Sequence, residues 1–312
     1  MNKHLIVILK ILAATAAFGY IAHEICVQVS SDALLQIPRL NIVPLVIAIA
    51  LMPINWIVEA KKWQQLVKHL QPLLLGEAVK SVFMGLAASL ITPNRIGDFA
   101  GRIVVLQAKN RLSGAMSVFV GSVAQMLAIA LFGVVAMCFK PNLPNILNWV
   151  EQHYTFIVIV LIVLLIAAVL LYFFIDFFAL QFRLKQFKWL EKFIQAAGYH
   201  TKQQLFIAIW LSVVRYIIFS FQFYLILQAM GISLSAQEAF CSIALMYCFV
   251  TILPSFALAE WGIRGSMALL FIVPLGGTAT QIVATSIIVW IINVATPALL
   301  GCLLIVQKSP KA

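Results

Sequence analysis

Long apolar stretches without a single charged residue dominate the chain. Residues 116–139 and 155–175 are two of them. A helix needs about 20 apolar residues to cross the hydrocarbon core of a bilayer, and soluble cores do not require such stretches. The pattern therefore predicts an all-α, polytopic membrane protein with about six full spans. The expected spans are Leu5–Ala22, Ile42–Val58, Ala115–Cys138, Thr155–Phe178, Leu205–Met230 and Ile282–Val306.

Two further apolar regions are interrupted near their centres by proline and charge. Val79–Leu106 is broken at residues 92–98, and Ala239–Ile272 is broken at residues 254–264. Each half has only about 12 to 16 apolar residues, which is short for a full span. We interpret each region as a re-entrant helical hairpin, whose polar tip must be enclosed by protein or line a wet cavity. Two complete crossings are the alternative, and they would leave the topology elsewhere unchanged.

The composition supports a membrane protein and changes how the charge is interpreted. The chain has 312 residues, is 63% hydrophobic and 10% charged, and carries a formal net charge of +11. In a soluble protein this charge would suggest nucleic-acid binding. Here the basic residues lie between the apolar stretches, where they set topology and contact anionic headgroups. We therefore expect no nucleic-acid partner.

The distribution of lysine and arginine predicts the orientation. With a cytoplasmic N-terminus and two re-entrant hairpins, only Arg39 and Lys140 face outward. Cytoplasmic loops of membrane proteins are enriched in basic residues, so both termini are expected in the cytoplasm. The N-terminal segment looks like a signal peptide at first, but Lys10 interrupts it and no small-x-small cleavage site follows, so it is taken as the first span. The expected cytoplasmic basic residues number 14: Lys3, Lys10, Lys61, Lys62, Lys68, Lys109, Arg111, Arg183, Lys185, Lys188, Lys192, Lys202, Lys308 and Lys311.

The order of spans and hairpins divides a single transmembrane domain, 1–312, into two halves. Residues 1–139 start inside and residues 155–312 start outside, each with two spans, a hairpin and a span. This is an inverted-topology repeat, an arrangement common in transporters with a midplane site. The hairpin tips also match, because Pro93 and Pro254 each precede an acid and a base four residues apart. Such a pair shares one helix face and can form an ion pair; chance similarity of two interfacial loops is the alternative.

Ionisable residues inside membrane segments are the candidate functional residues. The six candidates carry four positive and two negative charges, an excess that suits an anion such as a lipid phosphate, which arginine binds through paired hydrogen bonds. Arg215 lies deep in its span, so a buried partner is expected. The lone polar residues Gln125 and Asn293 are expected to form interhelical hydrogen bonds. The six are Arg95, Asp98, Arg102, Arg215, Glu260 and Arg264.

These considerations predict a substrate-binding site with a primary and a secondary set of residues. Alternatively, the arginines of the first hairpin could extend to the headgroups, and residues 59–63 could form a belt at the membrane interface. Gly97 and Gly101 form a GxxxG motif that would allow close helix packing. The primary set is Asn94, Arg95, Asp98, Arg102, Glu260 and Arg264, and the secondary set is Lys62, Trp63 and Arg215.

The sequence contains no motif of nucleotide-binding, serine-hydrolase or zinc-protease chemistry. The five cysteines have neither paired spacing nor histidine neighbours, so no metal, cofactor or structural disulfide is expected. They are Cys26, Cys138, Cys241, Cys248 and Cys302.

Several motifs resemble the transmembrane region of lysylphosphatidylglycerol synthases, the flippase domain of multiple peptide resistance factors, and its stand-alone relatives. The family's basic-Trp motif is matched by residues 60–63, and its Pro-Gly-Arg-x-Gly-Glu motif followed by Arg is matched by residues 93–98 and Arg102. Pro254 and Glu260 match a late Pro followed by Glu. Departures include Asn94 for Gly and Asp98 for Glu. The resemblance implies transfer of a lipid or lipid-linked substrate across a prokaryotic inner membrane, without the soluble aminoacyl transferase domain.

The first hypothesis is accordingly a flippase that moves an anionic phospholipid or lipid-linked substrate between leaflets. Its expected partners are this substrate and the surrounding membrane lipids, and no enzymatic activity is expected. The chain is compatible with a homo-oligomer. A membrane-embedded transferase with a lipid-phosphate donor is the rival, and it needs Asp98 or Glu260 as a general base. A non-catalytic scaffold is the third alternative. The sharpest expectation is that Asp98 and Arg102 share one mid-membrane cavity with Glu260 and Arg264, because clustering lowers the cost of charges in the bilayer.

Overall fold

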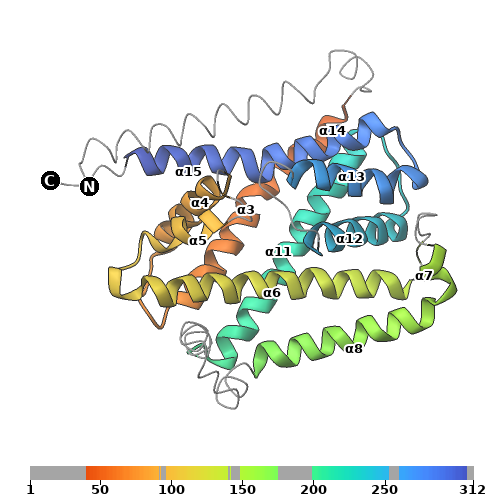
Figure 1. Cartoon of the computed structure of the whole chain (residues 1–312). Helices are drawn as coiled ribbons and strands as arrows, with labels where there is room; N and C mark the ends of the chain where they lie inside the picture. The colour runs from red at the N-terminus through yellow and green to blue at the C-terminus, as the bar shows by residue number, and fades with distance from the viewer. Residues whose placement is uncertain are drawn as a thin grey trace.

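The computed structural model describes residues 40–90, 92, 96–139, 141, 148–174, 199–252 and 260–307, and every regular element in these ranges is a helix. The expected first span, Leu5–Ala22, lies outside the described residues. So do the hairpin residues 93–95 and 253–259 and the side chain of Glu260. The chain is an all-α, multi-pass membrane protein (Figure 1).

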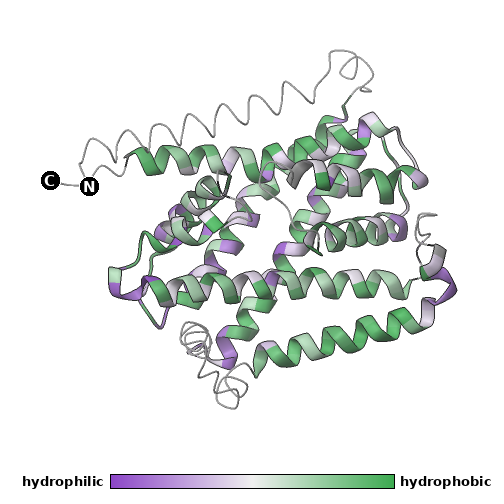
Figure 2. Ribbon diagram, in the orientation of Figure 1, coloured by the Kyte–Doolittle hydropathy of each residue, from purple (hydrophilic) through white to green (hydrophobic). Residues whose placement is uncertain are grey.

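Five helical segments among the described residues are long and apolar enough to cross a membrane, and they coincide with the five predicted spans in this part of the chain. Figure 2 shows hydrophobic residues along most of α6, α8 and α15, and hydrophilic residues on α3 and α11 inside the molecule. The segments are α3 (Ile42–Val67), η2 with α6 (Ala108–Asn110 and Arg111–Cys138), α8 (Tyr154–Phe173), α11 (Lys202–Ala229), and α14 with the π-helix η5 and α15 (Ala279–Trp290, Ile291–Ala295 and Thr296–Gln307).

Helix α3 is longer than the sequence predicted, because it continues past Val58 to Val67. The added turns carry charged residues, and charged residues in the hydropathy pattern indicate the end of a span. The structure buries part of this charge inside the protein, where ion pairs compensate it, so the helix continues.

Both interrupted regions form a pair of short, packed helices, as predicted. The first pair is α4 (Leu75–Leu90) and α5 (Ile96–Ile103), and the second is α12 (Ala236–Ile252) and α13 (Glu260–Ile272). A 3-10 turn, η4 (Val273–Leu275), follows α13. At 1.5 Å per residue, even α12 spans only about 26 Å, less than the hydrocarbon core.

Hydrogen bonds place three helix ends at one end of the molecule. The Asn110 side chain, just before α6, donates to the Leu70 carbonyl beyond the C-terminus of α3 (3.0 Å). The Gln204 side chain, in the first turn of α11, donates to the Gln65 carbonyl of α3 (3.1 Å). Because α4 follows α3 and α5 precedes α6, the α4–α5 hairpin opens at this end.

The second hairpin opens at the opposite end. There the Asn41 amide, at the N-terminus of α3, donates to the Ala229 carbonyl at the C-terminus of α11 (2.9 Å). The Gln237 side chain, at the N-terminus of α12, donates to the Phe139 carbonyl just beyond α6 (3.5 Å). The two hairpins therefore enter from opposite ends of α6, as an inverted repeat requires; the division into two related halves itself stays a prediction.

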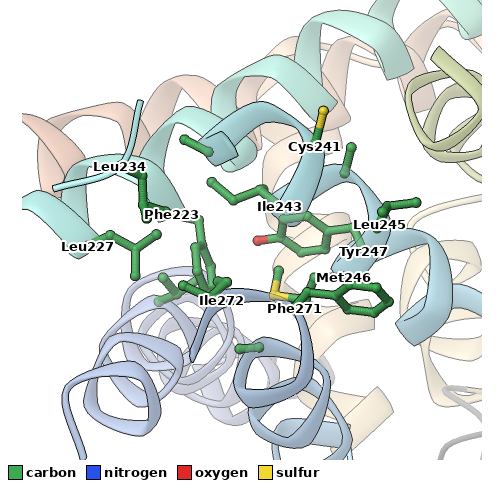
Figure 3. Close-up of a cluster of buried hydrophobic side chains, with 14 of the residues drawn as sticks. Phe223, Leu227, Leu234, Cys241, Ile243, Leu245, Met246, Tyr247, Phe271 and Ile272 are labelled. Carbon is green, nitrogen blue, oxygen red and sulfur yellow. The ribbon is translucent and has the colours of Figure 1, made fainter. Parts of the chain in front are cut away.

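The largest apolar core lies where α11, α12 and α13 meet (Figure 3). Phe223 and Ile272 are fully buried, and Tyr247 packs against Phe223 with ring centroids 6.1 Å apart. In a membrane, lipid tails are as apolar as these side chains, so close packing rather than water exclusion holds the helices together.

Candidate functional site

A buried carboxylate on α3, Glu59, lies at the centre of a group of charged side chains. Its oxygens are 2.8 Å from Lys62 Nζ, 2.7 Å from Arg102 Nη1 and 3.1 Å from Arg215 Nη1. Only 3% of Glu59 is exposed. A carboxylate of α3 thus binds cations from three helices, α3 itself, α5 and α11.

The interfacial-belt interpretation of residues 59–63 is wrong for Glu59, Lys62 and Trp63. Lys62 is 2% exposed and donates to the Ser212 hydroxyl of α11 at 3.2 Å, and Trp63 is 1% exposed. Of residues 59–63, only Lys61, on the opposite face of α3, is exposed. The face of α3 that carries the charge packs against α11, and its lysine therefore belongs to the protein interior rather than to a cytoplasmic loop.

The first hairpin contributes Asp98 and Arg102, which form the predicted ion pair across one turn of α5. Arg102 Nε donates to Asp98 Oδ1 at 2.7 Å. The predicted close approach also exists: a Cβ added at Gly101 would collide with the backbone of Gly85 on α4, and one added at Gly85 would collide with the Asp98 side chain. These glycines bring α5 so close to α4 that Arg102 is held where it meets Glu59.

Arg215 has the buried partners expected from its depth in the span. Besides Glu59, its Nε donates to Asn55 Oδ1 (3.2 Å) and its Nη1 to Gln125 Oε1 (3.4 Å). Its guanidinium carbon lies 5.2 Å from the centre of the Trp56 ring, within the range of a cation–π interaction. Three helices, α3, α6 and α11, thereby fix the orientation of this arginine.

We call Glu59, Lys62, Asp98, Arg102 and Arg215 the ion cluster. With every group ionised, these five described side chains carry three positive and two negative charges. An uncompensated charge inside a membrane protein is costly, and such residues usually mark substrate or ion pathways.

The second hairpin has one described candidate residue, Arg264, which packs against α12. The guanidinium carbon of Arg264 lies 5.8 Å from the centre of the Tyr247 ring on α12, within its own hairpin. Asn94 and Arg95 lie outside the described residues, as does the side chain of Glu260. The shared cavity of the two acid–base pairs therefore stays a prediction.

Sequence reasoning did not include Glu59 among the candidate site residues. A usable signal was present, because Asn55, Glu59 and Lys62 recur at helical spacing and so lie on one face of α3. The interhelical hydrogen bonds expected for Gln125 and Asn293 are both observed, to Arg215 and to Asn55 respectively.

Two of the cavities lined by described residues lie outside the ion cluster. One, of about 270 Å³, lies at the open end of the second hairpin beside Glu238. The other, of about 260 Å³, lies between α6, α11 and α12 and is almost entirely apolar. Tyr216, the residue after Arg215, lines it and stacks on Phe132 with centroids 4.2 Å apart. Within the described ranges, no three His, Cys, Asp or Glu residues lie close enough together to hold a metal ion.

The fold and the ion cluster define a multi-pass α-helical membrane protein with a charged interior. The family model of the lysylphosphatidylglycerol synthase transmembrane region matches residues 7–301, nearly the whole chain. The chain belongs to this family, as its motifs indicated. A search of curated proteins found no match.

Proposed function

We propose that the protein is a flippase that moves an anionic phospholipid or lipid-linked substrate between the leaflets of an inner membrane, with both termini in the cytoplasm. The observation that carries the proposal is the ion cluster, whose five described side chains bring three cations and two anions together in the interior of a membrane protein. Membership of the family supports a role in lipid transfer.

The chemistry of the cluster favours a phosphate group as the bound anion. Arg102 and Arg215 offer planar guanidinium groups, which match the oxygens of a phosphate, and Lys62 adds a point charge. A phosphodiester has a single negative charge, which would balance the cluster. The apolar cavity lined by Tyr216, the residue after Arg215 in α11, offers room for part of an acyl chain.

Transport explains the carboxylates better than the rival transferase does. A general base must be free to accept a proton from the substrate. Asp98, one of the two candidate bases of the transferase, already accepts a hydrogen bond from Arg102. Glu59 is bound to three cations. Hairpins that open at opposite ends also fit a transporter that exposes its site to each side in turn.

A reconstitution experiment tests the function. Purified protein in liposomes should move fluorescent phosphatidylglycerol between leaflets faster than protein-free liposomes do. Arg215→Gln removes the excess positive charge and leaves two cations with two carboxylates, so it should fold but slow transport about tenfold or more, the worth of a charged hydrogen bond.

Lys61→Gln is the matched control, because this lysine is on the same helix as the cluster but exposed, and its loss should leave the rate unchanged. Equal movement of phosphatidylglycerol by wild type and Arg215→Gln, or none above the protein-free rate, would refute the proposal.

A further inference from the structure

A pair of buried asparagines extends the ion cluster toward the π-helix η5. Arg215 Nε donates to Asn55 Oδ1 at 3.2 Å, and Asn55 Nδ2 donates to Asn293 Oδ1 at 2.9 Å. A guanidinium group has donors only, so Asn55 must turn its oxygen toward Arg215 and its NH2 group toward Asn293. Asn293 must then accept with its oxygen. The orientation of both amides follows from this chemistry.

The chain of hydrogen bonds ends on a donor without an acceptor. Asn293 is 7% exposed, and its Nδ2 has no hydrogen-bond partner within the described part of the chain. Nearby, Trp56 is 4% exposed, its ring faces Arg215, and its Nε1 also lacks an acceptor there. A buried donor left without a partner destabilises a protein, and π-helical turns often occur at functional sites. Two such donors next to a cation-rich cluster indicate a place for a ligand's oxygen atoms.

The expected acceptor is uncharged. One anion is enough to balance the ion cluster, so a second negative group would bring an excess of negative charge. Two hydrogen bonds connect Arg215 to Asn293, which places the free NH2 group on the order of 10 Å or less from the guanidinium group. A diacyl glycerophospholipid has neutral ester carbonyls only a few bonds from its phosphate. A polyprenyl phosphate has none.

We propose that the Asn293 side chain donates a hydrogen bond to an ester carbonyl of a diacyl phospholipid whose phosphate lies at the ion cluster, with the Trp56 indole as a second donor. This proposal rests on the proposed function and makes it specific. Asn293 selects ester-linked diacyl lipids over lipids that carry the same charge without ester groups.

The test compares two lipids that differ only in these carbonyls. The purified full chain in detergent is titrated with ester-linked phosphatidylglycerol and with its ether-linked analogue, and the midpoint of thermal unfolding reports the apparent affinity. Loss of one neutral hydrogen bond should weaken binding of the ether lipid about fivefold. Asn293→Leu, similar in size but without the amide, should bind both lipids equally.

A matched control is Ser286→Ala on α14, because this buried hydroxyl already donates to the Ile282 carbonyl of its own helix at 3.1 Å. It should keep the fivefold preference. Trp56→Phe keeps the ring and removes the N–H, so a weakened preference is expected there, and it replaces Asn293→Leu if that variant does not fold.

Equal binding of both lipids by wild type, or a full preference in Asn293→Leu or in the Trp56→Phe variant that replaces it, overturns the ester site. The same proteins are then assayed for leaflet transport. A preference for the ester lipid without any transport would refute the proposed function and leave the ester site standing, so the two failures are distinguishable.

Discussion

At the scale of single residues, Glu59 holds the ion cluster together, because its one carboxylate compensates cations from three helices. Burying charge is costly, and removing one partner of a buried pair is worse than never having had the pair, since the remaining charges lose their compensation. Glu59 thus links α3 to the first hairpin and to α11.

Replacing Glu59 should therefore destabilise the protein strongly. Glu59→Gln leaves three cations with Asp98 alone, and we expect it to lower the free energy of unfolding by about 3 kcal/mol. Denaturant unfolding in detergent measures the change. Glu151→Gln, an exposed carboxylate on the short helix α7 (Asn148–Gln152), should stay within about 0.5 kcal/mol of wild type. A similar small effect for both variants would contradict the central role of Glu59.

A pair of histidines beyond the helix ends predicts that stability depends on pH. His69 follows α3, and its ring centre lies 4.8 Å from that of His200, which precedes α11. Burial lowers the pKa of His69 from its ordinary value of 6.5, and the His200 ring lowers this pKa further. The folded state therefore favours neutral His69, and as the pH falls below 6.5 the unfolded chain takes up a proton first.

Stability should accordingly decrease as the pH falls from about 6.5 toward the lower pKa of the folded state, and then level off. Thermal unfolding between pH 7.5 and 5 measures the trend. We expect His69→Gln to flatten the slope and His153→Gln, an exposed histidine, to leave it unchanged. A slope that persists in His69→Gln would assign the effect to other groups.

The sequence predicted the ion pair of Asp98 and Arg102 because spacing along a helix is local information. It did not predict that Arg102 reaches Glu59, 43 residues earlier, or that Arg215 reaches Asn55, 160 residues earlier. These contacts depend on how the helices pack, which the sequence does not show. From the hydropathy pattern alone, a glutamate and a lysine near the end of a span are assigned to the membrane interface.

At the scale of elements, the α4–α5 hairpin depends on glycines where the helices touch. The interrupted hydropathy pattern predicted two short helices in each hairpin, and Gly97 and Gly101 predicted their close packing. The extension of α3 to Val67 was not predictable, because it requires knowing that its last charged face is buried.

A methyl group at Gly85 should disturb the hairpin. In Gly85→Ala the new Cβ collides with Asp98, so α5 must shift and Arg102 must move away from Glu59. We expect a loss of about 1–3 kcal/mol in stability, as for other overpacked sites, together with slower lipid transport. Gly76→Ala, in the first turn of the same helix with open space around it, should be neutral or slightly stabilising. Wild-type behaviour of Gly85→Ala would show that the helices are not so close.

At the scale of the whole molecule, the basic residues predicted an orientation, and hydrogen bonds now show which helix ends lie together. The ends of α3 and α6 meet at Leu70 and Asn110, and the end of α11 meets α3 at Gln204 and Gln65. These ends carry the basic segments expected in the cytoplasm. The repeat could be predicted only as a pattern, because its first span lies outside the described residues.

Labelling of introduced cysteines can measure this orientation. Lys109 and Gln237 are both exposed and lie at opposite ends of α6. In a variant without the native cysteines, a membrane-impermeant maleimide should label Gln237→Cys in intact cells and Lys109→Cys only after permeabilisation. The reverse pattern would invert the orientation.

The central claim is that the excess positive charge of the ion cluster binds an anionic lipid, and mass spectrometry of lipids that copurify with the protein tests it most directly. We predict that wild type retains an anionic phospholipid above its share of the membrane. Arg215→Gln, with a balanced cluster, should lose this enrichment, and Asp98→Asn, with one more positive charge in excess, should keep or increase it. The same lipid profile in all three proteins, or enrichment of zwitterionic lipid alone, would contradict the claim.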